Sequence, residues 1–299
     1  MSARRGTFSI VAADLAAGEV GCAVQSKYFS VGSVVPWVRA GVGAVATQAS
    51  AVAAYGERAL AELERGAAPE DALHRVLEGD SGSERRQLGI VTADGVAAAF
   101  TGIACIDWAG HRVGAGYAVQ GNILAGEAVV VAMEHAFEET VGPLVHRLVA
   151  ALEAGQEAGG DKRGQQSAAV VVERTGAAEA TNEGVDRICE LHVEDHVAPI
   201  AELRRLVGIW TGWEAMREAN LHYERGAYAE AADAMTAPAA EAGADPVLVY
   251  NLACYQSLAG RRDRAIASLR RAIEADPSYR ALAAGDADFD PIRADVASL

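Results

Sequence analysis

The spacing of apolar and polar residues changes several times along the first half of the chain. Short apolar runs at 8–13 and 19–25 are joined by the turn-like segment DLAAG, and this arrangement predicts a β-hairpin. A third strand is expected at 41–48. The spacing then becomes helical in YGERALAELERG and PEDALHRVLEGD, where Gly66 ends one helix and Pro69 begins the next.

Strand-like spacing returns after these two helices. RQLGIVTADGVAAAFTG has apolar runs on both sides of Asp94-Gly95, which predicts a second hairpin. GYAVQGN at 116–122 predicts another strand, and helical spacing follows from about 124 to 155. QQSAAVVVER and DRICELHVED predict two further strands. The order is therefore strands, two helices, strands, two helices, strands.

This order predicts an α+β fold over residues 1–205. Hairpin links favour antiparallel sheets, and the many glycines and alanines allow layers to approach closely. Two sheets face to face, each with a pair of helices outside, bury all the apolar faces. We therefore predict a four-layer αββα sandwich. A doubly wound α/β sheet is the alternative, and the tight hairpins disfavour it.

The remainder of the chain, 206–299, shows only helical spacing. ERGAYAEAADAM and LAGRRDRAIASL align at a period of 34, which pairs Gly226 with Gly260 and Met235 with Leu269. This period and its small-residue pattern are typical of tetratricopeptide repeats. Two copies are fewer than such arrays need to stand alone. We expect a small all-α, tetratricopeptide-like region that leans on the preceding helix, on the main domain, or on a second subunit.

Composition narrows the classes of partner. The 299 residues carry a formal charge of -15, from 26 basic and 41 acidic side chains. Nucleic acids and anionic membranes need a basic face, so neither is expected as a partner. The four cysteines form no C-x-x-C pair, which indicates reduced, buried thiols. No apolar run has the length of a transmembrane helix.

The same features bear on location and on cofactors. Arg4-Arg5 before an apolar run resembles a twin-arginine signal, but Asp14 and Glu19 interrupt that run, so a cytoplasmic protein is expected. The motif HVEDH, from His192 to His196, is conceivable as a metal site. A solvated strand end is favoured, because the sequence points to no further ligand. No metal or cofactor is expected, and GDKRG at 160–164 predicts a solvated turn.

The candidate chemistry lies at Gly6-Thr7, directly before the first strand. A threonine hydroxyl is a poor nucleophile unless a base lies beside it. The α-amine of an N-terminal threonine is such a base, with a pKa of about 7.7–8.0. Lys27 ends the second strand of the hairpin, where pairing places a residue near 25–27 opposite Thr7, and its charge would lower that pKa. The alternatives are an ordinary β-branched strand residue at Thr7 and an exposed strand-end charge at Lys27.

A family resemblance strengthens the nucleophile hypothesis. TFSIVAAD, GVGAVATQAS, RQLGIV, AAFTG, WAGHRVGAGYAVQGNILAG and GGDKRGQQSAAVVV occur in this order and resemble the family catalogued as domain of unknown function 1028. The resemblance covers roughly residues 7–205. That family in turn resembles the N-terminal-nucleophile (Ntn) hydrolases, which have the αββα fold. The resemblance implies that Thr7 is the nucleophile, that its amine is the base, and that the Gly6–Thr7 bond is cut.

The resemblance also implies supporting roles for other residues. Backbone N–H groups at Gln48 and Ala49 would form the oxyanion hole, and Asn122, Asp161 and Ser167 would surround the amine. The expected activity is hydrolysis of a C–N amide bond in a small or peptide-like substrate. The alternative is a non-catalytic Ntn-fold protein whose helical repeats bind a partner. Association through those repeats, with a second copy or another protein, is expected in either case.

Overall fold

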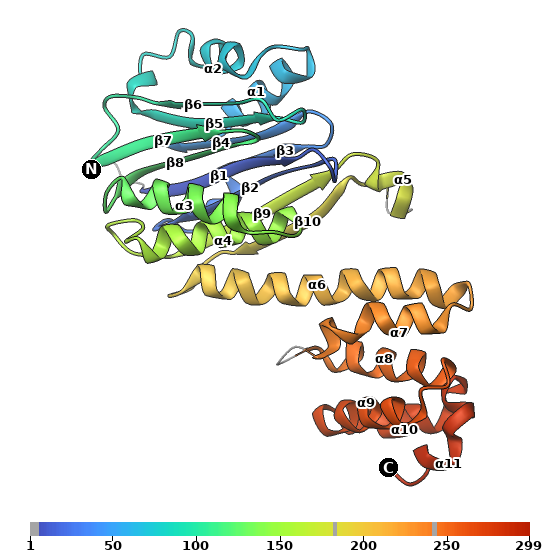
Figure 1. The fold of residues 1–299 in the computed structure, drawn as a ribbon. Helices are drawn as coiled ribbons and strands as arrows, with labels where there is room; N and C mark the ends of the chain where they lie inside the picture. Colours follow the sequence, from blue (N-terminus) through green and yellow to red (C-terminus); the bar gives the residue numbers. More distant parts are fainter. Residues whose placement is uncertain (1–5, 182–183, 241–243) are drawn as a thin grey trace. The chain divides into compact units, whose positions relative to one another are not determined.

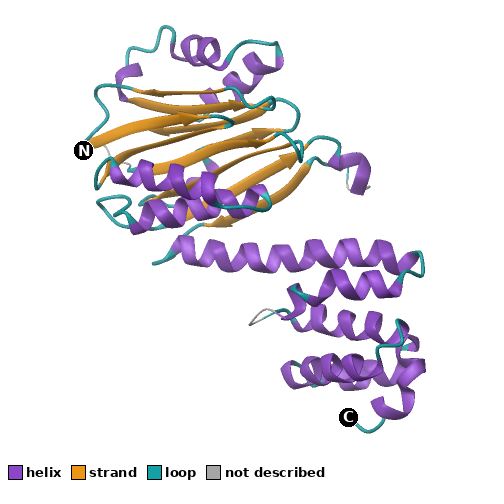
Figure 2. Ribbon diagram, viewed as in Figure 1, coloured by secondary structure: helices purple, strands orange, loops and turns teal. Residues whose placement is uncertain are grey.

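The computed structural model describes residues 6–181, 184–240 and 244–299 (Figure 1). The chain divides into two compact units, Met1–Leu206 and Val207–Leu299, and the division falls inside a long helix. The described residues of the first unit form both sheets, and those of the second unit are helical (Figure 2). The predicted mixed α+β fold with a helical C-terminal region is therefore confirmed.

The elements of the first unit are, in chain order, β1 (Thr7–Asp14), β2 (Glu19–Ser26), β3 (Pro36–Arg39), β4 (Gly43–Ala49), α1 (Ala54–Glu64), α2 (Pro69–Leu77), β5 (Arg86–Thr92), β6 (Ala97–Thr101), β7 (Trp108–Gly114), β8 (Tyr117–Leu124), α3 (Ala128–Glu139), α4 (Leu144–Glu157), β9 (Ser167–Arg174), α5 (Ala177–Thr181) and β10 (Arg187–Val193). The helix α6 (Pro199–Glu224) contains the division. The second unit continues with α7 (Tyr228–Thr236), α8 (Pro246–Leu258), α9 (Arg262–Ala275), α10 (Ser278–Gly285) and α11 (Arg293–Val296).

The strands form two sheets. One has the order β10-β9-β2-β1-β8-β7 and the other the order β3-β4-β5-β6, and neighbouring strands run antiparallel. The predicted hairpins β1–β2 and β5–β6 are both present. Two strands were not predicted: β3 is short and begins with a proline, and β7 is a largely exposed edge strand with a mixed pattern. The predicted antiparallel pairing is confirmed.

Apolar packing fixes the faces of both sheets. A core of small side chains, including Val11, Val24, Ala46 and Val91, lies between the sheets. The helices α1 and α2 pack on the outer face of the four-stranded sheet, and α3 and α4 lie against the six-stranded sheet (Figure 1). The strand β1 is central in its sheet, with β2 on one side and β8 on the other. Its first residue is therefore held from both sides.

The second unit has its own core, and the residues that the period of 34 pairs can be compared within it. The central helix α8 is buried on nearly all sides. Gly226 and Gly260, which the period of 34 pairs, have φ values of 72° and 73° and each follows the end of a helix. Met235 and Leu269 are both fully buried. The two copies thus share backbone conformation and burial. Within the described residues, no helix combines the length and apolar content needed to span a bilayer.

Candidate active site

Thr7 stands at the start of β1 with a polar residue opposite it on each neighbouring strand. Ser26 of β2 and Asn122 of β8 are its register partners. Cross-strand partners share a face of the sheet, so all three side chains lie on the face between the sheets. Thr7 is 3% exposed, and its Oγ1 donates a hydrogen bond of 3.1 Å to Ser26 Oγ. The hydroxyl of Thr7 is therefore oriented by Ser26.

Lys27 follows Ser26, the last residue of β2, and is exposed whereas Ser26 is fully buried. Its ammonium is exposed and donates to the Gln165 carbonyl at 3.0 Å. Its backbone N–H donates to Asp161 Oδ2 at 3.2 Å. The predicted window of 25–27 thus contains the true partner of Thr7, which is Ser26. An effect of Lys27 on the amine pKa of Thr7 stays a prediction.

The carbonyl oxygen of Gly6 is held by two donors. Ser26 Oγ donates to it at 2.5 Å, and Arg163 Nη2 donates at 2.7 Å. Arg163 also donates to the Asp161 carboxylate through Nε at 3.0 Å and Nη2 at 2.6 Å, and the Asp161 side chain is fully buried. A Cβ on Gly6 would lie only 2.7–2.8 Å from that carboxyl group, so this position accepts glycine. The Gly6–Thr7 peptide is therefore fixed at its carbonyl and at the neighbouring hydroxyl.

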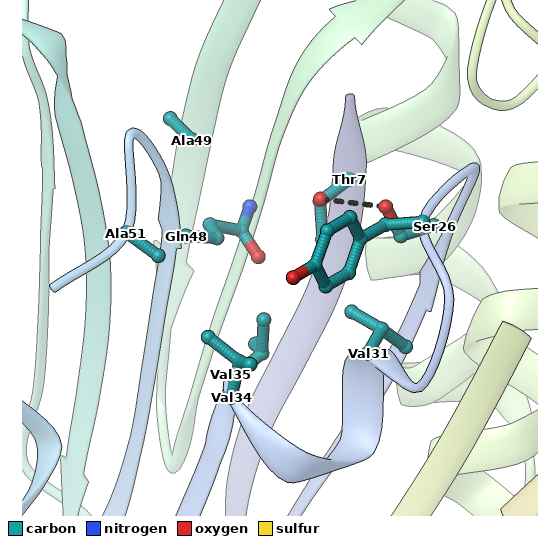
Figure 3. A pocket seen from close by; sticks show the side chains of 9 residues that line it. Thr7, Ser26, Val31, Val34, Val35, Gln48, Ala49 and Ala51 are labelled. Atoms are coloured by element: carbon teal, nitrogen blue, oxygen red, sulfur yellow. Dashed lines mark hydrogen bonds between the residues drawn. The ribbon is translucent and has the colours of Figure 1, made fainter. Parts of the chain in front are cut away.

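A pocket opens over Thr7 (Figure 3). Its free space, including the open mouth, is about 240 Å³. The lining residues are Thr7, Ser26, Tyr28, Val31, Val34, Val35, Gln48, Ala49 and Ala51. Ser167 supports one wall from behind: its Oγ accepts from the Val31 N–H at 3.0 Å and donates to the Tyr28 carbonyl. The pocket thus brings together Thr7, Gln48 and Ala49 of the predicted site.

A buried network of side-chain amides positions Gln48. Its Oε1 accepts from Ser9 Oγ at 2.6 Å, and its Nε2 donates to Gln87 Oε1 at 2.8 Å. Asn122 Nδ2 donates to the same Gln87 oxygen at 3.0 Å, and Gln87 Nε2 donates to the Gly121 carbonyl at 2.8 Å. Asn122 therefore acts on the pocket through Gln87. Both ends of the Gln48 amide are engaged, so this side chain holds the wall of the pocket.

Ala49 has a left-handed backbone, with φ of 65°. Such a conformation costs a non-glycine residue of order 1–3 kcal/mol and persists only where its surroundings impose it. The N–H of Thr47 donates to Val35 on the β3 side, and that of Ser50 donates to Arg85 on the β5 side. Because N–H directions alternate along a strand, the N–H of Ala49 is directed past the end of β3, where Ala49 borders the pocket.

The sequence reasoning missed several residues of this site, among them Ser26, Tyr28, Gln87 and Arg163. Ser26 lay inside the predicted pairing window, and a fixed register would have identified it. Arg163 lies in the predicted solvated turn GDKRG, yet its guanidinium reaches Gly6 over a separation of 157 residues. Gln87 belongs to a predicted strand, but nothing in its local sequence indicates that it faces another sheet. These contacts depend on tertiary packing.

Metal-binding geometry occurs elsewhere. In HVEDH, β10 ends at Val193; His192 contacts Glu190 and Glu194 at 3.4 Å, and His196 Nδ1 accepts from the Ala198 N–H.

Within the described ranges, one group of side chains has the spacing of metal ligands: Cys254, Asp286 and Asp288, whose ligand atoms lie within 4.8 Å of one another. Tyr250 and Tyr223 donate to its two carboxylates. Burial raises the pKa of Asp288 and of the Cys254 thiol. Protein donors thus account for this cluster.

Comparison with known proteins identifies a family and a similar solved structure. The family described as "Family of unknown function (DUF1028)" matches residues 7–203. The crystal structure of protein SPO2555 from Silicibacter pomeroyi, itself described with the DUF1028 family, is similar to this chain at 33% sequence identity and a TM-score of 0.62. The match covers 70% of this chain and 89% of that chain. No curated protein matches the sequence.

Proposed function

We propose a function on one premise: this chain belongs to the DUF1028 family, whose own function is unknown. The proposed function is hydrolysis of a C–N amide bond with Thr7 as an N-terminal nucleophile of the Ntn type. The observation that carries the proposal is the shared hydrogen-bond chain from the Thr7 hydroxyl through Ser26 to the Gly6 carbonyl. It supports both a mature N-terminus at Thr7 and the later use of the same hydroxyl on a substrate.

The same chain supplies a route for cutting the Gly6–Thr7 bond. Thr7 Oγ1 bonds to the Gly6 carbonyl carbon, and its proton passes through Ser26 to the Gly6 oxygen. Arg163 donates to that oxygen, where negative charge develops. The tetrahedral species loses its hydroxyl proton, the C–N bond breaks, and the Thr7 nitrogen takes up a proton. Water then hydrolyses the ester, which leaves a carboxylate on Gly6 and a free amine on Thr7.

Turnover of an external amide follows the same chemistry with a different base. The freed α-amine takes the proton from Thr7 Oγ1, and the oxygen bonds to the acyl carbon of the substrate. The Ala49 N–H is the proposed donor to the oxyanion. The leaving amine departs with a proton, and water releases the acyl group. Asp161 and Arg163 act as positioning residues that hold the segment before Thr7.

The arrangement of layers supports the Ntn classification. Two antiparallel sheets with helices packed on them, and a central strand that begins at Thr7, support the proposed αββα sandwich. Four free cysteines agree with the proposed cytoplasmic location. In the second unit, the matched conformations of Gly226 and Gly260 support a tetratricopeptide-like repeat. We propose that this unit binds a second copy of the chain or another protein.

The intact mass of the purified protein tests the proposal. We expect a chain that begins at Thr7, and Thr7→Ala should keep its N-terminal segment. Gly6→Ala should slow cleavage of the bond before Thr7 at least about tenfold, because the added methyl would crowd Asp161. Ser26→Ala should slow it by a similar factor, because it removes the hydroxyl that relays the proton. Ser81→Ala is the matched control, since Ser81 is exposed. An active protein that retains residues before Thr7 would exclude Thr7 as an N-terminal nucleophile.

A non-catalytic binding protein is the second candidate, and the separate core of the helical unit favours it. In that case the helical unit would carry the function, and Thr7 would be an ordinary buried strand residue without a catalytic role. The oligomeric state of the full chain, compared with that of residues 1–206, distinguishes the two roles of this unit. A full-length chain that associates no more than the shorter one would remove self-association from the proposal.

A further inference from the structure

We infer that the pocket over Thr7 selects an uncharged, short aliphatic acyl group, an inference that rests on the proposed hydrolase function. Of the nine lining residues that the structure describes, none is Asp, Glu, Lys, Arg or His. Five are valine or alanine. The chemistry of the wall therefore matches a hydrocarbon chain attached to the carbonyl that Thr7 attacks.

The polar groups of the pocket are already engaged or have a catalytic task. Ser26 Oγ bonds to the Gly6 carbonyl and to Thr7, and the Gln48 amide is held by Ser9 and Gln87. The Ala49 N–H is assigned to the oxyanion. The hydroxyl of Thr7 is the nucleophile, so these residues leave no polar side chain for a charge on the acyl group, and Tyr28, the remaining polar residue of the described lining, is uncharged. A buried charge without a partner is strongly disfavoured, so a carboxylate or ammonium in this pocket would be rejected.

The charged residues near Thr7 lie outside the described lining of the pocket. Asp161 accepts from Arg163, which also donates to the Gly6 carbonyl, and the Lys27 ammonium donates to the Gln165 carbonyl. None of them lines the pocket as it is described. The described lining of the pocket thus offers no charged side chain to the acyl group.

Burial and hydrogen bonds hold the apolar wall of the pocket in place, and the space inside the pocket is small. Val31 and Val35 are 2% and 3% exposed, and the Val34 carbonyl accepts from Trp37 Nε1 at 3.1 Å. Ser167 fixes the same segment at Tyr28 and Val31. The enclosed part of the pocket has a volume of only about 10 Å³, room for roughly one water-sized group, and the free space of about 240 Å³ includes the open mouth. The lining therefore admits only the first part of a short acyl chain, and the rest of the chain lies in the mouth.

The first arm of the test measures turnover by the full-length protein. The probes are p-nitroanilides of butyrate, of succinate as its monoamide, and of 4-aminobutyrate, which share a chain length and differ in charge. We expect kcat/KM for the butyryl probe to exceed that of both charged probes by at least about tenfold. Equal or faster cleavage of a charged probe would overturn the inference and leave the proposed hydrolase function intact.

The second arm measures binding without chemistry. Butyramide, succinamate and 4-aminobutyramide are titrated against Thr7→Ala by ligand-observed NMR, and butyramide should bind at least about tenfold more tightly than the charged amides. Selective binding of butyramide by a protein that cleaves no anilide would uphold the inference and remove the hydrolase function. Absence of any butyramide binding, or equal binding of all three, would overturn the inference.

A charge placed in the pocket provides the matched comparison. Ala51→Lys adds a cation to the lining, and Ala53→Lys adds one to an exposed position two residues away. Ala51→Lys should raise the ratio of succinamate to butyramide binding at least about fivefold, because the carboxylate gains a partner. Ala53→Lys should leave the ratio unchanged. Equal ratios in both variants would show that the amides bind elsewhere and would overturn the inference.

Discussion

Two groups of residues at the start of β1 differ in chemistry. The neutral face, which is the face toward the other sheet, carries Thr7, Ser26 and Asn122 and opens into the pocket. The charged pair, Asp161 and Arg163, lies at the segment before the strand, where Arg163 donates to the Gly6 carbonyl. The neutral face can meet a ligand, whereas the charged pair holds the backbone before Thr7. The pocket therefore has a neutral lining although an ion pair lies next to the peptide bond before its nucleophile.

Loss of the Thr7 hydroxyl removes the proposed nucleophile from the neutral face, and we expect it to have the largest effect on activity. Thr7→Ala should lower kcat/KM by at least about a thousandfold, because no other group replaces a covalent nucleophile. Thermal unfolding should change little, since the methyl of alanine remains in the strand. Thr7→Ser is the matched variant and should keep measurable turnover. Activity in Thr7→Ala within tenfold of the wild type would place the nucleophile elsewhere.

Loss of one charge disrupts the pair formed by Asp161 and Arg163. Asp161→Asn should lower the free energy of unfolding of the first unit by about 3–5 kcal/mol, because a buried partner of Arg163 loses its charge. The exposed Glu139→Gln in the same unit should stay within about 0.5 kcal/mol. Urea unfolding followed by circular dichroism measures both. If the two variants unfold alike, the Asp161–Arg163 pair is not what holds the strand end.

The buried amide network tests whether the neutral face must be held in place for activity. Gln87→Leu removes the acceptor of Gln48 and Asn122, and leaves the Gly121 carbonyl without its donor. Unpaired buried polar groups cost about 1–3 kcal/mol each, so the loss of stability should be about 2–3 kcal/mol after partial repacking. Activity measured below the unfolding transition should also fall, since Gln48 would reorient. A stable variant with unchanged kcat would limit the network to a packing role.

Lys27 offers the smallest and most discriminating change. Lys27→Met removes an exposed ammonium whose hydrogen bond is to the Gln165 carbonyl. We expect a change in stability within about 0.5 kcal/mol. The acidic limb of the pH–rate profile decides its catalytic role: a shift to higher pH would show that the ammonium lowers the amine pKa of Thr7. An unchanged limb would assign Lys27 to the strand end alone.

Local patterns predicted the elements around Thr7 but could not resolve faces. The turn between Asp14 and Gly18 and the flanking apolar runs were enough to place the β1–β2 hairpin. An uncertainty of one residue in the strand register leaves the predicted hairpin unchanged. It alters the predicted site, because a shift of one residue moves each side chain to the other face of the sheet. Ser26 and Lys27 are neighbours in sequence and belong to different environments. Sequence reasoning therefore selected the charged neighbour.

The remaining contacts are long-range and follow no local rule. Arg163 meets Gly6 only because α4 and the turn after it return to the start of β1. Gln87 meets Gln48 and Asn122 because two sheets stack, so its importance appears only once the layers are known. The period of 34 is a local signal, and the two glycines that it pairs, Gly226 and Gly260, have φ values of 72° and 73°. The tetratricopeptide-like nature of this unit stays a proposal.

The Gly6 carbonyl, held by Ser26 and Arg163 at the proposed cut, has a practical consequence for anyone preparing this protein. An affinity tag fused ahead of residue 6 would leave with the N-terminal segment if the bond before Thr7 is cut as proposed. Material captured through such a tag would be enriched in uncut, inactive chains, and an assay on it would record a false negative. A tag placed after Leu299 would recover cut and uncut chains alike, so the fraction that has matured could be counted and related to activity.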